Sequence, residues 1–248
     1  MTARTLHRHH IDHEGARIPV FIARPAAPPR VTVVMFGAIW SVTDHIEDLC
    51  TRLAHEGFGA IAPCLFRGQG IPARDAPPEV LAQTFVDFDD RRCVRDLRAV
   101  VRAAHDGRLG AELGSAPGAL VTLGFCLGGR FAHLLGAVSE HVAGVVNFYG
   151  RLRFARQANK PFLPIELTGL IEAPYLGHFA QFDDLIPLAD VEELRGALAE
   201  RGVAHAIHVY EGARHGFVDP ERPTEHHREA AALAWSRTLE FLHQRAAS

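Results

Sequence analysis

Short apolar runs typical of buried strands alternate along the chain with longer runs in which apolar residues recur at helical spacing. The strand-like runs are 18–23, 31–36, 58–62, 119–125, 142–148, 175–182 and 205–210. Apolar residues recur at helical spacing after a cap at Thr43 or Asp44. The same spacing occurs over 91–105, 127–138, 191–201 and 225–243. This alternation predicts an α/β fold, a single domain with a mainly parallel central sheet and helices on both faces. Segments 64–88 and 150–171 have no regular pattern and are expected to be irregular.

Composition narrows the possible partners. The 248 residues are 48% hydrophobic, which is enough for one sizeable core. The net charge is -3 and the Lys and Arg residues are scattered, so no nucleic-acid partner is expected. No apolar run is long enough for a signal-peptide core or a membrane span, so we expect a cytoplasmic protein without a membrane partner, either monomer or homodimer.

Histidines gather near the N-terminus and again before the last predicted helix, and they raise the question of a metal site. They are His7, His9, His10, His13, His226 and His227. No cysteine or carboxylate stands beside them at the spacing of a zinc site. We therefore expect neither a metal nor a cofactor. Residues 1–14 are expected to form a flexible N-terminal segment before a domain at 15–246.

The segment TLGFCLGGRF places Cys126 between a predicted strand and a predicted helix. Gly124 and Gly128 stand two residues before and after it, where a nucleophile elbow needs small residues so that the backbones can pass. At such a turn the free N–H groups and dipole of the following helix favour a thiolate. Cys126 is therefore a candidate nucleophile, and the alternative is a small buried hydrophobe.

A base and an orienting acid follow in the second half of the chain. Asp183 and Asp184 end one predicted strand, and His215 lies in the loop after the last one. The order cysteine, acid, histidine is that of α/β-hydrolases. The chain has 16 histidines, but His215 alone lies directly after the last predicted strand and before the final predicted helix.

Three motifs in this order resemble the dienelactone hydrolase family over residues 17–242. They read GFCLGG, Asp183-Asp184-Leu185-Ile186-Pro187 and His215-Gly216-Phe217. The resemblance implies an α/β-hydrolase fold and a cysteine-dependent hydrolase of a small ester or lactone, acting through an acyl-enzyme.

The resemblance also implies a role for each residue of the motifs. Cys126 would be the nucleophile, His215 the base, and Asp183, which stands four residues before the proline, the orienting acid. The backbone N–H groups of Ile39 and Leu127 would form the oxyanion hole.

The chain departs from the family pattern near the expected nucleophile. Ala38 stands where the family usually has a glutamate that helps to activate the thiol, so Cys126 would depend on His215 and the helix terminus. Cys64 replaces a common aspartate, and we assign it a packing role.

The two arginines that hold the substrate carboxylate in the type enzyme are not retained either. Their positions fall near Pro78 and on Asp219. Possible substitutes, each expected to be a solvated surface arginine, are Arg67, Arg74, Arg151, Arg153 and Arg222. Candidate contacts for the small-molecule substrate are Ala38, Trp40, Phe66, Phe85, Phe88, Tyr149 and Arg222.

Other functions on the same scaffold stay open. A thioesterase would use the same triad, whereas amides should be poor substrates because a thiolate leaves a tetrahedral intermediate more easily than an amine. A pseudoenzyme that keeps the elbow for binding or redox sensing is a second alternative. A glutamine amidotransferase-like enzyme is disfavoured, since its acid follows the histidine closely and Gly216, Phe217 and Val218 follow His215 here.

Overall fold

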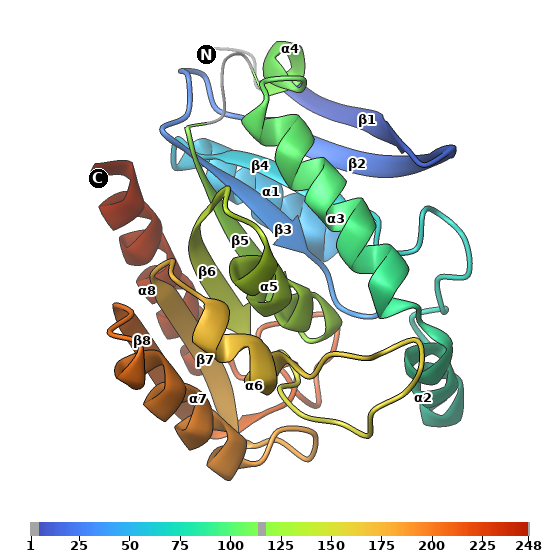
Figure 1. Ribbon diagram of the computed structural model, residues 1–248, viewed down its shortest axis with the longest axis vertical. Helices are drawn as coiled ribbons and strands as arrows, with labels where there is room; N and C mark the ends of the chain where they lie inside the picture. The colour runs from blue at the N-terminus through green and yellow to red at the C-terminus, as the bar shows by residue number, and fades with distance from the viewer. Residues whose placement is uncertain (1–4, 114–117, 248) are drawn as a thin grey trace.

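The computed structural model describes residues 5–113 and 118–247 (Figure 1). Its centre is an eight-stranded sheet with the order β1-β2-β4-β3-β5-β6-β7-β8. The strands are β1 (Thr5–His13), β2 (Ala16–Arg24), β3 (Val31–Phe36), β4 (Gly59–Pro63), β5 (Ala119–Phe125), β6 (Val142–Phe148), β7 (Tyr175–Phe182) and β8 (His205–Arg214). β1 and β2 are antiparallel to their neighbours, and the strands from β4 to β8 are parallel.

Helices cover both faces of this sheet. They are α1 (Asp44–His55), α2 (Pro78–Asp87), α3 (Asp90–His105), α4 (Gly110–Leu113), α5 (Leu127–Val138), α6 (Pro164–Leu167), α7 (Leu188–Glu200) and α8 (Arg228–Ala247), with a 3-10 turn η1 (Thr168–Leu170). α1 and α8 lie on one face, and α3, α5 and α7 lie on the other (Figure 1). The central strands β3 and β4 are buried along their whole length, as expected for parallel strands covered on both faces. The predicted single-domain α/β fold is confirmed.

The parallel strands bring several loops to one edge of the sheet. The carboxyl ends of β3, β5, β7 and β8 lie at this edge, where ligands of α/β proteins bind. The loops that follow these strands carry the turn at 37–41, Cys126, Asp183 and His215. In the described part of the chain, no helix is both long and apolar enough to cross a bilayer.

The prediction of a flexible segment over 1–14 is wrong for most of its length. Residues 5–13 form strand β1, which pairs antiparallel with β2 from Thr5 and Arg24 to His13 and Ala16. Glu14 and Gly15 make a two-residue turn with φ angles of 46° and 71°, the conformation that joins hairpin strands. Pairing with β2 orders a segment whose many histidines suggested solvation; residues 1–4 lie outside the described part of the chain.

Segment 64–88 also contains more regular structure than its sequence indicated. It includes helix α2, which begins with Pro78 at its first position and buries none of its residues. Leu81, Phe85 and Val86 of α2 line a cavity, and Leu81 and Phe85 also pack against the edge of the core. Segment 150–171 is mostly irregular, as expected, with only the short α6 and η1.

A buried polar network supports the end of β6. Tyr175 Oη accepts a hydrogen bond from Asn147 Nδ2 at 2.8 Å and lies 3.0 Å from His133 Nδ1. Burial lowers the pKa of His133 to about 4, so its ring is neutral at neutral pH. Its Nε2 donates to the Pro164 carbonyl at 2.8 Å, which leaves Nδ1 to accept from the Tyr175 hydroxyl. Asn147 Oδ1 in turn accepts from the N–H of Gly150 at 2.8 Å and fixes the turn after β6.

We predict that Tyr175→Phe lowers the free energy of unfolding by about 1 to 3 kcal/mol, because it leaves two buried polar groups without a partner. Urea denaturation at neutral pH measures the change. Phe162→Tyr is the matched control, since this ring is 54% exposed and gains a hydroxyl in solvent. The control should stay within about 0.5 kcal/mol of wild type. A Tyr175→Phe protein that unfolds at the wild-type urea concentration would show that the network does not stabilise the fold.

Candidate active site

Cys126 occupies a strained turn between β5 and α5. Its φ and ψ angles are 54° and -113°, a region that residues other than glycine rarely adopt. Neighbouring backbones approach so closely that side chains are excluded. A Cβ on Gly124 would lie 2.1 Å from the Gly128 carbonyl oxygen, and one on Gly128 would lie 2.1 Å from the Phe36 carbonyl oxygen. The Cys126 N–H donates to the Phe148 carbonyl at 3.0 Å, which anchors the turn to β6.

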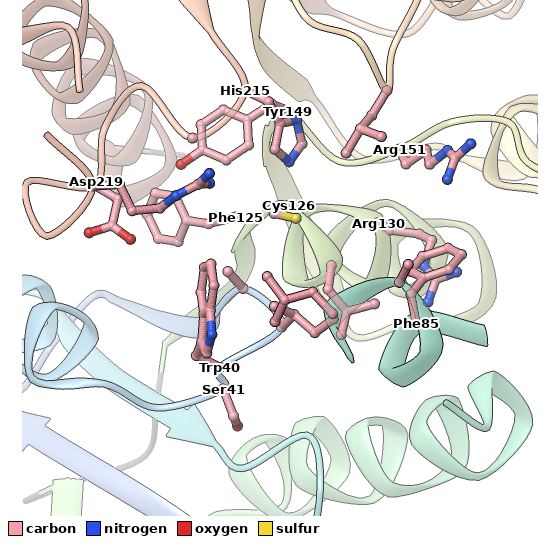
Figure 2. Close-up of a pocket in the computed structure, with 18 of the residues that line it drawn as sticks. Trp40, Ser41, Phe85, Phe125, Cys126, Arg130, Tyr149, Arg151, His215 and Asp219 are labelled. Atoms are coloured by element: carbon pink, nitrogen blue, oxygen red, sulfur yellow. The ribbon is translucent and has the colours of Figure 1, made fainter. Parts of the chain in front are cut away.

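His215 and Asp183 lie together beside this turn. His215 Nδ1 is 2.8 Å from Asp183 Oδ2, and the two side chains are 15% and 1% exposed. The other carboxylate oxygen, Oδ1, accepts from the Leu185 N–H at 2.9 Å. Asp184, the alternative acid, is exposed. Figure 2 shows the imidazole of His215 directed toward the sulfur of Cys126.

The other ring nitrogen of His215, Nε2, is buried and has no hydrogen bond of ordinary length to the described residues. The ring of Tyr149 packs edge-on against the imidazole, with centroids 5.1 Å apart. The imidazole is therefore held by Asp183 on one side and Tyr149 on another. Its free nitrogen faces the thiol.

The electrostatics of this group favour an ion pair. Burial alone would raise the pKa of Cys126, but the charge of His215, polar contact with its ring and the backbone N–H of Leu127 outweigh burial and lower the pKa below its ordinary 9.0. Burial opposes charge on His215, yet the thiolate and the Asp183 carboxylate raise the pKa of His215 to about 10. Both shifts stabilise a thiolate beside an imidazolium.

The backbone N–H groups predicted to form an oxyanion hole belong to Leu127 and Ile39. Leu127 is the first residue of α5, so its N–H has no partner within the helix. Ile39 lies in the tight turn at 37–41, in which the Ser41 N–H donates to the Ala38 carbonyl at 2.8 Å. Ser41 has a φ of 58°, and its hydroxyl accepts from the Leu65 N–H at 2.9 Å. Both Ile39 and Leu127 line the same cavity as Cys126.

A cavity of about 550 Å³ opens above Cys126, with walls that are mainly apolar. The expected contacts that line it are Ala38, Trp40, Phe85, Tyr149 and Arg222. Phe66 and Phe88 are not among the lining residues. They pack edge-on against each other with centroids 4.8 Å apart, and Phe88 continues to Phe131 in the core. The assignment of these two rings to the pocket is therefore corrected.

Several lining residues were not anticipated from the sequence. Helix α2 contributes Pro78, Leu81, Ala82 and Val86, and the segment after β6 contributes Phe154. Arg130 also lines the cavity. Its position in the quoted segment TLGFCLGGRF, as the one charge in the first turns of an apolar helix, is the signal that could have identified it.

The arginines considered as substitutes divide into two groups. Arg67 and Arg153 lie outside the cavity, where Arg67 pairs with Asp96 and Arg153 pairs with Asp190 and Glu193. Arg74, Arg151 and Arg222 line the cavity. Arg151 and Arg222 are half-buried, whereas Arg74 is exposed, as expected.

Other candidates from the sequence lie elsewhere. Cys64 is buried outside the cavity, where its sulfur accepts from the Gly68 N–H at 3.2 Å. His9 pairs with Glu112 and His10 contacts Arg17, both on the β1 side of the molecule. Across 5–113 and 118–247, no three histidine, cysteine or carboxylate side chains gather as a metal site would require.

The fold and this elbow define the chain as an α/β-hydrolase. The chain belongs to the dienelactone hydrolase family, because the family model described as "Dienelactone hydrolase family" matches residues 18–246. This confirms the family expected from the three sequence motifs.

Individual relatives agree with this assignment. A "Putative carboxymethylenebutenolidase" of Escherichia coli (strain K12) is 33% identical over 237 residues, covering 94% of this chain and 85% of the relative. The crystal structure of a "Putative Dienelactone Hydrolase" from Klebsiella pneumoniae subsp. pneumoniae superposes with a TM-score of 0.86 at 32% identity, covering 98% and 99% of the two chains. An α/β hydrolase named MGS-M1 from a deep-sea metagenome library shares the fold, with a TM-score of 0.72 at 14% identity over 100% of both chains.

We predict that Gly128→Ala destabilises the protein by at least about 2 kcal/mol, because the new Cβ would meet backbone atoms that cannot rotate away. Gly196→Ala is the matched control, since Gly196 lies in α7 with open space around it. The control should gain up to about 1 kcal/mol from the better helix propensity of alanine. Thermal unfolding of both variants measures the difference, and equal stability would contradict the close packing of the elbow.

We also predict that Cys126 ionises at a lower pH than an ordinary thiol, whose pKa is 9.0, and becomes protonated on acidification. The difference in ultraviolet absorbance between wild type and Cys126→Ser measures the thiolate. His215→Asn should move the ionisation to higher pH, since burial then raises the thiol pKa without the charge of His215 to oppose it. Cys64→Ser is the control and should keep the signal. A wild-type thiol that ionises only above its ordinary pKa of 9.0 would refute the ion pair.

Proposed function

We propose that this chain hydrolyses small carboxylic esters or lactones through a covalent acyl-enzyme on Cys126. One observation carries the proposal. The thiol stands on a strained elbow at the wall of a cavity of about 550 Å³, next to a histidine that a buried carboxylate holds at 2.8 Å. A nucleophile, a base and an orienting group in this arrangement are the parts that nucleophilic acyl transfer requires.

In the first half of the reaction, the thiolate of Cys126 attacks the ester carbonyl carbon and forms a carbon–sulfur bond. The carbonyl oxygen becomes an oxyanion that accepts hydrogen bonds from the N–H groups of Ile39 and Leu127. The intermediate collapses as the bond to the leaving alkoxide breaks. The imidazolium of His215 gives its proton to that alkoxide, leaving a thioester on Cys126 and a neutral imidazole.

In the second half, water replaces the alcohol. Neutral His215 takes a proton from the water as its oxygen attacks the thioester carbonyl. The second tetrahedral intermediate breaks its carbon–sulfur bond, releasing the acid and restoring the thiolate beside the imidazolium. Asp183 keeps the ring oriented and stabilises its positive charge in both halves, without itself taking a proton.

This mechanism needs no carboxylate at position 38. The charge of His215 and the N–H of Leu127 already hold the thiol pKa below its ordinary value despite burial. Ala38 contributes a small apolar wall to the cavity instead. Activation therefore rests on the ion pair and on the start of α5.

The apolar lining of the cavity and the names of the relatives support small esters or lactones as substrates. The apolar walls suit a compact acyl group or a lactone ring. Esters and lactones are favoured over amides, because an amine leaves the tetrahedral intermediate less easily than the thiolate does. The relatives named carboxymethylenebutenolidase carry a name that denotes hydrolysis of a butenolide lactone. Thioesters fit the same mechanism, so they belong in the substrate panel.

The test is a panel of p-nitrophenyl acetate, a small lactone, a thioester and a matched amide. Wild type should hydrolyse the first three and leave the amide nearly untouched. Cys126→Ser and His215→Asn should each lose at least about a thousandfold in kcat, and Asp183→Asn about a hundredfold or more. Cys64→Ser serves as the control and should stay close to wild type.

Acid quenching during turnover, followed by mass spectrometry, should reveal the acyl group on the peptide that contains Cys126. Hydrolysis of no panel member by wild type, or full activity of Cys126→Ser, would refute the mechanism.

A further inference from the structure

One end of the cavity carries positive charge without an equal negative charge. Figure 2 shows Arg130, Arg151 and Phe85 on one side of Cys126, and Trp40 and Asp219 on the other. All five line the cavity. We use the name arginine end for Arg130, Arg151 and Phe85 together with the residues that contact them, which are Asp90, Phe131, Phe154 and Lys160.

Arg130 is the centre of the arginine end. Its side chain is fully buried, and its Nη2 donates to Asp90 Oδ1 at 2.8 Å. The Nε and Nη1 groups are buried, and neither has a hydrogen-bond partner among residues 5–113 and 118–247. Buried guanidinium N–H groups are almost always paired, because an unpaired one loses its hydration without replacement. Arg130 therefore carries unsatisfied donors at the wall of the cavity.

Aromatic rings hold the guanidinium in place. Its central carbon lies 4.9 Å from the ring centroid of Phe85 and 5.0 Å from those of Phe131 and Phe154. Such contacts stabilise the cation and restrict its rotation. They offer no acceptor for the unpaired N–H groups. Phe85 belongs to α2 and lines the cavity together with Arg130, packed against the core and against Phe154.

Nearby charges add to the excess. Arg151 and Lys160 lie 5.6 and 5.5 Å from the Phe85 ring centroid. The Lys160 ammonium donates to the carbonyl oxygens of Val86 and Phe88, which carry no net charge. Asp90 is the one buried carboxylate among these groups in the described structure, and its Oδ2 has no partner. Asp87 and Asp89 also act on Lys160, but both are exposed and neither lines the cavity.

The opposite end of the cavity differs because its cations are paired. Arg74 lies 3.0 Å from Asp219 and 2.7 Å from Glu221, and Arg222 lies 3.0 Å from Glu225. An incoming anion would have to displace these carboxylates. At the arginine end it would instead satisfy N–H groups that have no partner.

We propose that the arginine end binds an anionic group, carboxylate or phosphate, at the far end of the substrate's acyl chain. The proposal rests on the proposed ester hydrolysis at Cys126. It assigns substrate recognition to Arg130, with Arg151 as a second contact. The two positions where the family resemblance would place carboxylate-binding arginines, Pro78 and Asp219, line the same cavity without a positive charge. The recognising charge of this chain therefore comes from a different helix, the one that begins at the nucleophile.

Paired esters test the proposal: p-nitrophenyl pentanoate, and the mono-p-nitrophenyl ester of glutaric acid, which adds a terminal carboxylate at similar length. Wild type should prefer the acidic ester by about tenfold or more in kcat/KM, a preference typical of a buried charged hydrogen bond. Arg130→Met should reduce that ratio at least about tenfold, and Arg151→Met by about threefold. Arg153→Met is the matched control outside the cavity and should keep the wild-type ratio.

Arg130→Met also leaves Asp90 buried without its partner, so the double variant Asp90→Asn/Arg130→Met is measured beside it. It should show the same loss of preference. A binding assay on wild type avoids folding effects altogether. Glutarate should slow alkylation of Cys126 by iodoacetamide, and propylphosphonate should do so if the site accepts phosphate-like anions. Neutral pentanamide should not.

The outcomes separate this inference from the proposed function. Hydrolysis of both esters at equal efficiency, without protection by either anion, would overturn the arginine end as a binding site and retain the hydrolase. Protection by glutarate without hydrolysis of any ester would refute the hydrolase and retain the anion site. A wild-type preference that survives in Arg130→Met, the double variant and Arg151→Met would assign recognition elsewhere and overturn the proposal.

Discussion

The close approach of backbones at the turn from β5 to α5 is the constraint on which the rest of the site depends. Gly124 passes the start of α5, Gly128 passes the end of β3, and Gly129 passes Gly150 after β6, all at distances that no Cβ permits. This packing holds Cys126 in a conformation that costs free energy, and the neighbouring strands offset that cost. The thiol is consequently presented at the edge of the sheet without any movement of its own.

Because Cys126 is desolvated, its ionisation depends on the ion pair with His215. A buried thiol beside no charge would stay protonated, and here burial opposes the thiolate more than any other single influence. The imidazolium of His215 reverses that balance, and it can do so because Asp183 stabilises its charge from behind. A further carboxylate at position 38 would bring another negative charge near the thiolate. Its absence is therefore compatible with an ionised Cys126.

The features that depend on neighbouring residues could be predicted from the sequence. Continuous apolar runs identified the central strands, and glycine spacing around Cys126 identified the elbow, because both follow from packing of adjacent residues. β1 was missed because pairing with β2, rather than its own composition, orders it. Helix α2 and the position of Phe66 were not predicted, because both are determined by the surfaces that these residues contact in the folded chain. The unpaired N–H groups of Arg130 depend on Asp90 forty positions away in the sequence, so no local pattern could reveal them.

Helix α5 begins at the turn that holds Cys126, and it carries the charge that we assign to recognition. The Arg130 N–H donates to the Cys126 carbonyl at 3.1 Å, so the residue is fixed to the elbow by its backbone while its side chain reaches the cavity wall. A substrate anion bound by that side chain would be held at a fixed distance from the thiolate, because a rigid helix and not a loop connects the two. Under this proposal the charge that selects the substrate and the turn that holds Cys126 belong to one rigid element, whereas α2 supplies much of the apolar wall, so that wall can vary without loss of the geometry at Cys126.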